Sequence, residues 1–433
     1  MDVSGHFGPQ LRRWRTEADL SLAELARRTH YSKGYLSKIE TGVRPPSTGM
    51  ARRCDAALNA EGALMALVPP DTGEKPATPP ARIDQDELWV LGMGTEGSVW
   101  FQPVTRRETL TTGAASLVTL GLAGPPSSRA QQQEAAVVAA LSTVFSQVRA
   151  LGQQASPRVV LPALIAPTHT LQTMAATASS RGRAGCYLLA SRYAEYAGWM
   201  AQEAGHDTAA LWWTNKAVQL ASAGGDQELA AYALVRRALI SLYAGDAVQT
   251  IALARRAQEN HAAGNRIRGL AAQREAQGHA LAGANSDCQR ALDRATTLFD
   301  GATTGPGPVL GSSTVSNPVS LSTAWCLYDL GRPAQAADLL DRELSAVDPS
   351  ARRFHARWGT RRALAHAACG EIDHACALSW ELLDDVAVTD SATVHSDVRA
   401  LARTLARWLT HPPVRQLYPE LTAALHHRTI LHH

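Results

Sequence analysis

The residues best suited to do chemistry lie on one face of a short helix that the sequence predicts over 33–40. Leu36 and Ile39 are the apolar positions of this segment, so they define its inward face. The residues left on the outward face are small or cationic: Lys33, Gly34, Ser37 and Lys38. Ammonium and hydroxyl groups donate hydrogen bonds to phosphates and base edges, and a glycine lets the backbone approach a partner closely. This face is therefore a candidate for contact with a nucleic acid.

The elements that must position this face form a small helical bundle. Five helices are predicted, beginning near residues 8, 21, 33, 47 and 62. Ser21 and Glu24 form a capping box at the start of the second helix. A turn of three or four residues joins that helix to 33–40, and Ala26 provides the small side chain needed where two steeply crossing helices touch. Such a pair can project its second helix into the major groove of DNA, which is about 12 Å wide.

The charge distribution supports this interpretation. The net charge of the whole chain is only +3, too small for a general polyanion binder. Residues 1–53, however, contain ten Lys and Arg residues against five Asp and Glu. A local basic excess at one end of a chain is typical of a nucleic-acid-binding module.

Residues 8–66 are similar to the xenobiotic-response-element family of lambda-repressor-like domains, which are DNA-binding helix-turn-helix domains. The shared elements are LA, S-x-x-x-L-S-x-I-E-x-G and R-x-P-S, each at the expected spacing. The resemblance implies that the residues over the bases are Ser32, Lys33, Ser37 and Lys38. It also implies that phosphates are held by Ser21, Arg44 and the arginines of the first helix, Arg12, Arg13 and Arg15.

The full set of candidate DNA-contacting residues is Ser21, Ser32, Lys33, Gly34, Tyr35, Ser37, Lys38 and Arg44. Glu40 is instead expected to be a structural partner for an arginine of the same domain. Two positions depart from the family pattern, because His30 occupies the place of a usual glycine and Leu22 that of a common glutamine. We therefore expect a positive φ at His30 and the loss of one base contact at Leu22.

The chain divides into three parts, 1–68, 69–128 and 129–433. Residues 69–80 are rich in proline and threonine, which is typical of a semi-rigid linker. Over 88–104, two β-prone runs flank the sequence GMGTEG, which predicts a short β-hairpin. No helix follows these glycines directly, so they do not form a dinucleotide-binding motif.

The third part is alanine-rich, helical and repetitive, so the fold class is all-α. A glycine followed by polar turn residues recurs at intervals of 40, 38, 48 and 39 residues, at Gly205, Gly245, Gly283, Gly331 and Gly370. An insertion at 301–316, rich in Gly, Ser, Thr and Pro, explains most of the long interval. Helical hairpins repeated at such a period predict an α-solenoid. The units resemble lengthened tetratricopeptide repeats, and the domain combination resembles a class of actinobacterial regulators and the peptide-sensing regulators of Gram-positive bacteria.

Solenoids of this kind present a concave face to a ligand or a partner. Aromatic and polar residues in the first repeats are candidates for binding a peptide or a small molecule: Tyr196, Trp199, Trp212, Asn215, Tyr232 and Arg236. The alternative for each aromatic ring is a structural role between helices. The histidines near the C-terminus are interpreted as a frayed end rather than as metal ligands.

Two function classes follow from these features. The first is a transcriptional regulator that binds a double-stranded DNA operator as a homodimer and whose solenoid senses an effector. The second is an adaptor whose solenoid binds other proteins, with DNA contact secondary. An enzyme is not expected, because G-x-S-x-G, P-loop and HExxH motifs are missing from the sequence.

Six cysteines are scattered without CxxC spacing, which argues against a zinc site and a disulfide framework and favours a reducing cytoplasm. No metal or other cofactor is expected. The sequence shows no N-terminal apolar segment and no uninterrupted apolar run of the ~20 residues needed to span a bilayer, so no membrane association is expected.

Overall fold

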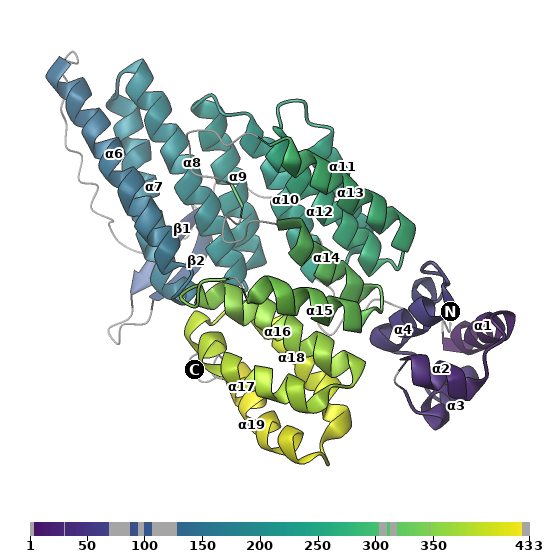
Figure 1. The fold of residues 1–433 in the computed structure, drawn as a ribbon. Helices are drawn as coiled ribbons and strands as arrows, with labels where there is room; N and C mark the ends of the chain where they lie inside the picture. Colours follow the sequence, from purple (N-terminus) through teal and green to yellow (C-terminus); the bar gives the residue numbers. More distant parts are fainter. Residues whose placement is uncertain are drawn as a thin grey trace.

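The structure, a computed structural model, describes residues 4–29, 31–68, 87–93, 99–105, 128–302, 310–311, 318–345 and 347–426. A small helical domain at the N-terminus is followed by a two-stranded hairpin and then by a curved stack of helices (Figure 1). The predicted all-α architecture, with a bundle, a hairpin and a solenoid in this order, is confirmed. His30 and its expected positive φ lie outside the described residues.

The N-terminal domain consists of α1 (Ser4–Glu17), α2 (Leu22–Thr29), α3 (Lys33–Glu40), α4 (Thr48–Leu58) and the 3-10 turn η1 (Met65–Leu67). Its largest core side chains that are at most 1% exposed are Phe7, Leu11, Leu25, Leu36, Ile39, Met50 and Leu64. Local capping fixes the start of α3, because the Ser32 hydroxyl accepts a hydrogen bond from the Tyr35 backbone N–H at 3.2 Å. Gly42 follows α3 with φ +72°, the left-handed conformation expected after a helix.

The fifth helix, predicted over 62–67, is shorter in the structure, where only the single 3-10 turn η1 forms. The Asp55 carboxylate, from α4, accepts hydrogen bonds from the backbone N–H groups of Gly62 and Met65, both at 2.7 Å. Gly62 also has φ +90°, which a regular helix does not allow. The buried Asp55 carboxylate thus takes the place of a helix cap, because it accepts hydrogen bonds from the backbone N–H groups at the start of this segment.

The hairpin pairs β1 (Glu87–Met93) with β2 (Val99–Thr105) in antiparallel register, with Leu91 opposite Phe101. This confirms the hairpin predicted over 88–104.

The solenoid begins with α6 (Ser128–Leu151) and α7 (Pro157–Thr177), which precede a series of helical hairpins. The hairpins are α8 (Ser180–Glu203) with α9 (Asp207–Ala223), α10 (Glu228–Tyr243) with α11 (Ala247–Gln258), α12 (Asn265–Leu281) with α13 (Asn285–Asp300), α14 (Pro318–Asp329) with α15 (Pro333–Leu344), and α16 (Arg352–Cys369) with α17 (Ile372–Thr389). The chain ends with α18 (Ala392–Leu405), η2 (Ala406–Trp408) and α19 (Pro412–His426). Figure 1 shows the hairpins stacked side by side along the curved body.

A glycine in the left-handed conformation turns the chain between the two helices of each hairpin. These glycines have φ between +77° and +93°: Gly205, Gly245, Gly283, Gly331 and Gly370. They are the five turn glycines from which the repeat was predicted, so the repeat is confirmed. The turn demands φ values that other L-residues rarely adopt, which explains why glycine marks the period.

Residues far apart in the sequence close the curve of the stack. The Arg353 side chain, at the start of α16, is 3% exposed and pairs with Glu203 at the end of α8, Nη1 to Oε2 3.1 Å. Its Nε and Nη2 also donate to the backbone carbonyls of Gly152 (2.7 Å) and Ala155 (2.6 Å), between α6 and α7. Ser391, just before α18, donates to the same Glu203 carboxylate at 2.5 Å. This buried cluster brings α16 and α18 against the start of the solenoid.

The N-terminal domain is docked on the solenoid. Arg52 of α4 pairs with Asp329 at the end of α14, Nη1 to Oδ1 3.1 Å. A Cβ added to Gly283 would lie 2.7 Å from Gly62 Cα, so the two backbones are in direct contact. Figure 1 shows the domain beside α14 and α15.

Helix α6 is unusual in its exposure. In the described part of the chain its segment Gln132–Leu151 is long and apolar enough, by length and composition alone, to cross a membrane, and 11% of that window is buried. One such helix is by itself weak evidence for a membrane span.

Candidate functional site

The outward face of α3 is arranged as the sequence predicts except at Ser37, which is half-buried. Leu36 and Ile39 are buried at 0% and 1% exposure, while Lys33, Gly34 and Lys38 are exposed. A Cβ placed on Gly34 would meet nothing within 4 Å, so the backbone there is open to a partner. The helix therefore presents two ammonium groups and an uncovered stretch of backbone on one surface, which can meet phosphates and base edges.

The Tyr35 ring packs between an aromatic ring and a guanidinium group. It stacks on Tyr31 with centroids 5.1 Å apart, and the Arg44 guanidinium lies 4.9 Å from its centroid. Tyr31 also lies under Arg407 of η2, 4.4 Å from guanidinium carbon to ring centroid. Stacked aromatic and guanidinium groups hold one another in place. Arg44, itself exposed, is thus held at the end of α3, where a phosphate contact is expected.

Of the other predicted phosphate contacts, Ser21 has a capping role, and Arg12 and Arg13 are exposed. The Ser21 hydroxyl accepts from the Glu24 backbone N–H at 3.1 Å, the first half of the predicted capping box. The second half is corrected, because the Glu24 carboxylate, predicted to reach back to Ser21, pairs with Arg27 and Arg28 instead. Arg12 and Arg13 of α1 are both exposed, and Arg13 pairs with Glu17 at 3.3 Å on the surface.

The phosphate contact predicted for Arg15 is wrong, because its guanidinium is engaged within the domain. Its Nε and Nη2 bind both oxygens of Glu40 at 2.7 and 3.1 Å, and its Nη1 donates to the Leu20 carbonyl at 2.9 Å. The hydrogen bond to Glu40 also raises the pKa of Arg15. This guanidinium ties α1 to α3, so it is not free to bind DNA. The structural role predicted for Glu40 is confirmed.

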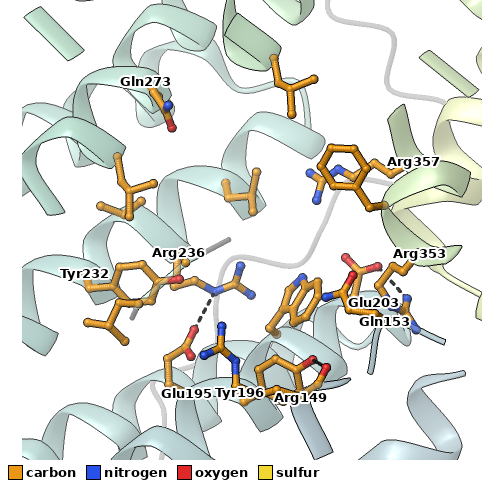
Figure 2. A pocket seen from close by; sticks show the side chains of 18 of the residues that line it. Arg149, Gln153, Glu195, Tyr196, Glu203, Tyr232, Arg236, Gln273, Arg353 and Arg357 are labelled. Carbon is orange, nitrogen blue, oxygen red and sulfur yellow. Dashed lines mark hydrogen bonds and ion pairs between the residues drawn. The ribbon is translucent and has the colours of Figure 1, made fainter. Parts of the chain in front are cut away.

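A cavity of about 460 Å³ lies inside the solenoid, lined by α6, α8, α10, α12, α14 and α16 (Figure 2). Four of the predicted ligand-binding residues line it: Tyr196, Trp199, Tyr232 and Arg236. Trp212 and Asn215 do not, because both lie on α9, the second helix of its hairpin. Trp212 packs edge-on against Trp213, with centroids 4.9 Å apart, and the Asn215 side-chain oxygen accepts a hydrogen bond from Arg237.

Sequence reasoning missed most of the cationic lining. The cavity has six arginines against two glutamates, Arg149, Arg192, Arg236, Arg274, Arg353 and Arg357 against Glu195 and Glu203. All but Arg149 lie on the first helix of a hairpin. An arginine that recurs in the first helix of successive repeats is the signal that could have identified them.

The two carboxylates are already engaged. Glu203 is bound by Arg353 and Ser391, as described above, and Glu195 lies 4.0 Å from Arg236 Nε. Burial raises the pKa of Glu195, although the nearby Arg236 opposes the shift. Burial and the neighbouring Arg357 lower the pKa of Arg274 to about 10, so it is still a cation at neutral pH. The cavity therefore has a net positive charge at neutral pH.

Among the described residues, two overlapping groups have side chains that could ligate a metal. They are Asp341, His366 and His374, and His366, Cys369 and Glu371, each with ligand atoms within 4.8 Å of one another. The two ring nitrogens of His366 already contact the carboxylates of Glu371, at 2.6 Å, and Asp341, at 3.2 Å. These pairs give the cluster a structural role in joining α15, α16 and α17.

Comparison with known proteins gives one match. Residues 6–68 match the family described as a helix-turn-helix domain, a span that runs from α1 through η1. No curated protein and no solved structure matches the chain. The N-terminal domain is thus a helix-turn-helix domain, which supports a DNA-binding regulator.

Proposed function

We propose that this protein is a sequence-specific transcriptional regulator of the xenobiotic-response-element type, acting in the cytoplasm. The observation that carries the proposal is the exposed face of α3 within a matched helix-turn-helix domain, with Lys33, Gly34 and Lys38 uncovered. In domains of this architecture the second helix of the pair enters the major groove, and its first residues contact base edges. The chain acts by binding rather than by catalysis in this proposal.

The tetratricopeptide-like solenoid is the sensing part of the proposed regulator. Two features support this role: a cavity of small-molecule size and direct contacts between the solenoid and α4. A ligand that changes the arrangement of the hairpins can then change the position of the DNA-binding domain.

Dimerisation is the third element of the proposal. Two recognition helices placed about one DNA turn apart, ~34 Å, would bind a nearly palindromic operator. Exposed apolar residues follow one another at heptad spacing on α6, with Val137, Val144 and Leu151 at 37%, 44% and 39% exposure. A stripe of this spacing suits packing against a second helix, and we assign it to a second copy of this chain.

The function is tested by selecting genomic fragments that the purified full-length protein binds, followed by footprinting of the recovered site at low salt. A protected, nearly two-fold-symmetric sequence supports the proposal. Protection that is equal on all fragments, or no protection at low salt, contradicts it.

The dimer is tested separately by sedimentation of the Val144→Glu variant. We expect the wild type to sediment as a dimer and Val144→Glu as a monomer. Val248→Glu is the matched control, because Val248 is 79% exposed but lies on α11. A monomeric wild type, or an equal effect of both substitutions, contradicts the assignment of α6.

A further inference from the structure

Buried donors without partners surround the cavity. Within the described part of the chain, four buried nitrogen atoms of its lining have no hydrogen-bond partner: Arg192 Nη1, Arg236 Nε, Gln273 Nε2 and Arg357 Nε. Gln273 and Arg236 are 2% and 6% exposed, so these are interior groups. In native proteins the great majority of buried polar atoms are hydrogen-bonded, and each exception requires an explanation.

All four atoms are N–H donors. An occupant that supplied acceptors would satisfy them, and an occupant that supplied only donors would not. Three of the four belong to guanidinium groups, which bind the oxygens of carboxylates, sulfonates and phosphates more strongly than neutral acceptors. Figure 2 shows the labelled arginines and Gln273 arranged around the same space.

The charge balance supports the same conclusion. Glu203 is engaged by Arg353 and Ser391, and Glu195 lies 4.0 Å from Arg236 Nε, beyond hydrogen-bond distance. Arg192 pairs with Asp226, outside the lining, at 2.9 Å. Among the described residues, the remaining arginines of the lining, Arg149, Arg274 and Arg357, have no carboxylate within 4.0 Å. Arg274 Nη1 donates to Gln277 at 2.6 Å, a neutral acceptor, and burial lowers its pKa. Cations that are held close together with too few anions favour an anionic ligand.

Much of the remaining wall is apolar and aromatic. It includes Phe145, Trp199, Leu270, Leu310, Phe354 and Trp358. The volume of about 460 Å³ is in the range of sites for small organic ligands. An inorganic ion alone would satisfy the donors but would leave this wall uncovered.

We propose that the cavity binds a small organic anion, a flat apolar body that has one or two carboxylate, sulfonate or phosphate groups. The anionic oxygens accept from Arg236, Gln273 and Arg357, and the body lies against Trp199 and Phe354. The binding claim stands on the cavity alone; its regulatory consequence rests on the function proposed above.

The test uses two dyes that differ only in a sulfonate group, anilinonaphthalene sulfonate and the neutral phenylnaphthylamine. Binding to the full-length protein is followed by dye fluorescence and by calorimetry. We expect one sulfonate dye per chain and an affinity about tenfold or more above that of the neutral dye, since charge-assisted hydrogen bonds are made only by the sulfonate. Equal affinity of the two dyes overturns the proposal.

Variants localise the binding. Arg236→Met is expected to weaken sulfonate-dye binding about fivefold or more while neutral-dye binding is maintained. Arg237→Met is the matched control, because Arg237 is the next residue along α10, its guanidinium binds Asn215, and it does not line the cavity. Gln273→Leu, which has nearly the same size and no change of charge, is a second test and is expected to weaken the sulfonate dye about threefold. An equal effect of Arg236→Met and Arg237→Met, or no effect of Gln273→Leu, overturns the proposal.

Thermal unfolding of each variant establishes that it is folded; if Arg236→Met does not fold, Gln273→Leu decides. The dye measurements contain no DNA, so the two proposals fail separately. Failure of footprinting with intact selective dye binding contradicts only the regulator, and the reverse result contradicts only the cavity ligand.

Discussion

The Arg52 guanidinium and the Asp329 carboxylate, 3.1 Å apart, join the helix-turn-helix domain to the solenoid. Asp329 is 7% exposed, and its second oxygen accepts a hydrogen bond from Trp325 Nε1 at 2.9 Å. Trp325 lines the cavity, and the Arg361 guanidinium lies 3.2 Å from its ring centroid. A single carboxylate therefore connects a wall of the cavity with the DNA-binding domain.

Asp329→Asn is expected to loosen the docking of the N-terminal domain. Arg52 would lose its charged partner in a half-buried position, at a cost of about 1–3 kcal/mol. Calorimetry should then show the N-terminal domain unfolding in a separate, earlier transition. Asp338→Asn is the control, because Asp338 is an exposed carboxylate on the neighbouring α15. Its calorimetric unfolding profile should be the same as that of the wild type. A separate transition in neither variant would contradict the bridging role.

Trp325→Phe tests whether the cavity communicates with α4 through this carboxylate. The substitution keeps an aromatic ring but removes the N–H that Asp329 accepts. At saturating anilinonaphthalene sulfonate, we expect hydrogen exchange of α4 to respond to the dye in the wild type and not in the variant. Saturation removes any change of dye affinity from the comparison. The same response in both proteins would show that coupling does not pass through Trp325.

Lys38→Ala is expected to weaken operator binding about tenfold and to reduce the slope of log K against log salt by about 0.9, if the ammonium contacts a phosphate. Lys38 is exposed and has no core contact to lose, so the thermal unfolding of the domain should not change. Arg290→Ala removes one exposed positive charge from α13 and is the control for net charge. Equal salt slopes in Lys38→Ala and the wild type would exclude Lys38 from phosphate contact.

The elements of the helix-turn-helix domain could be predicted because their signals are local. Ser32 caps α3 and Gly42 ends it, and the structure has the helix at the predicted 33–40. The turn glycines of the solenoid are equally local, since a positive φ is needed at each of them. For Arg15 the phosphate contact implied by the family resemblance is wrong, because its guanidinium binds Glu40 instead. Arg15 lies four residues after the buried Leu11, which places it at the edge of the apolar stripe and close to α3.

The cavity could not be derived in the same way. Its closure depends on Arg353 and Glu203, which are 150 residues apart in the chain. Its cationic wall is assembled from helices of several hairpins, and the orientation of each hairpin depends on the packing of the previous one. A solenoid period predicts a concave face, but the curvature that closes this face around a space follows from contacts between distant repeats.

Glu40→Gln is expected to destabilise the N-terminal domain by about 1–3 kcal/mol, because it leaves the Arg15 guanidinium without its bidentate partner. The side chains of this pair are only 12% and 8% exposed. Glu17→Gln provides the contrast, since the Arg13–Glu17 pair is 57% exposed on both sides and should contribute less than about 0.5 kcal/mol. Hydrogen exchange of the α1 and α3 amides measures both effects. Similar losses in the two variants would contradict the structural role of Glu40.

Glu275 predicts an acid-sensitive component of stability. Burial opposes its ionisation, but contacts with His279, Gln258 and Arg255 outweigh this and hold the pKa of Glu275 well below its ordinary value of 4.5. The unfolded chain therefore binds this proton at a higher pH than the folded chain does. The contribution of the ionised carboxylate is complete above about pH 4.5 and is lost as the pH falls below it, by up to about 1.4 kcal/mol per pH unit.

Glu275→Gln should be less stable than the wild type at neutral pH and should lose less stability on acidification. Urea unfolding at several values between about pH 3 and pH 7 measures both slopes. Glu259→Gln, at an exposed position just after α11, is the control and is expected to follow the wild type. A Glu275→Gln variant whose stability falls with acid as steeply as that of the wild type would mean that Glu275 does not supply this component. The acid sensitivity of the solenoid would then have to come from its other carboxylates.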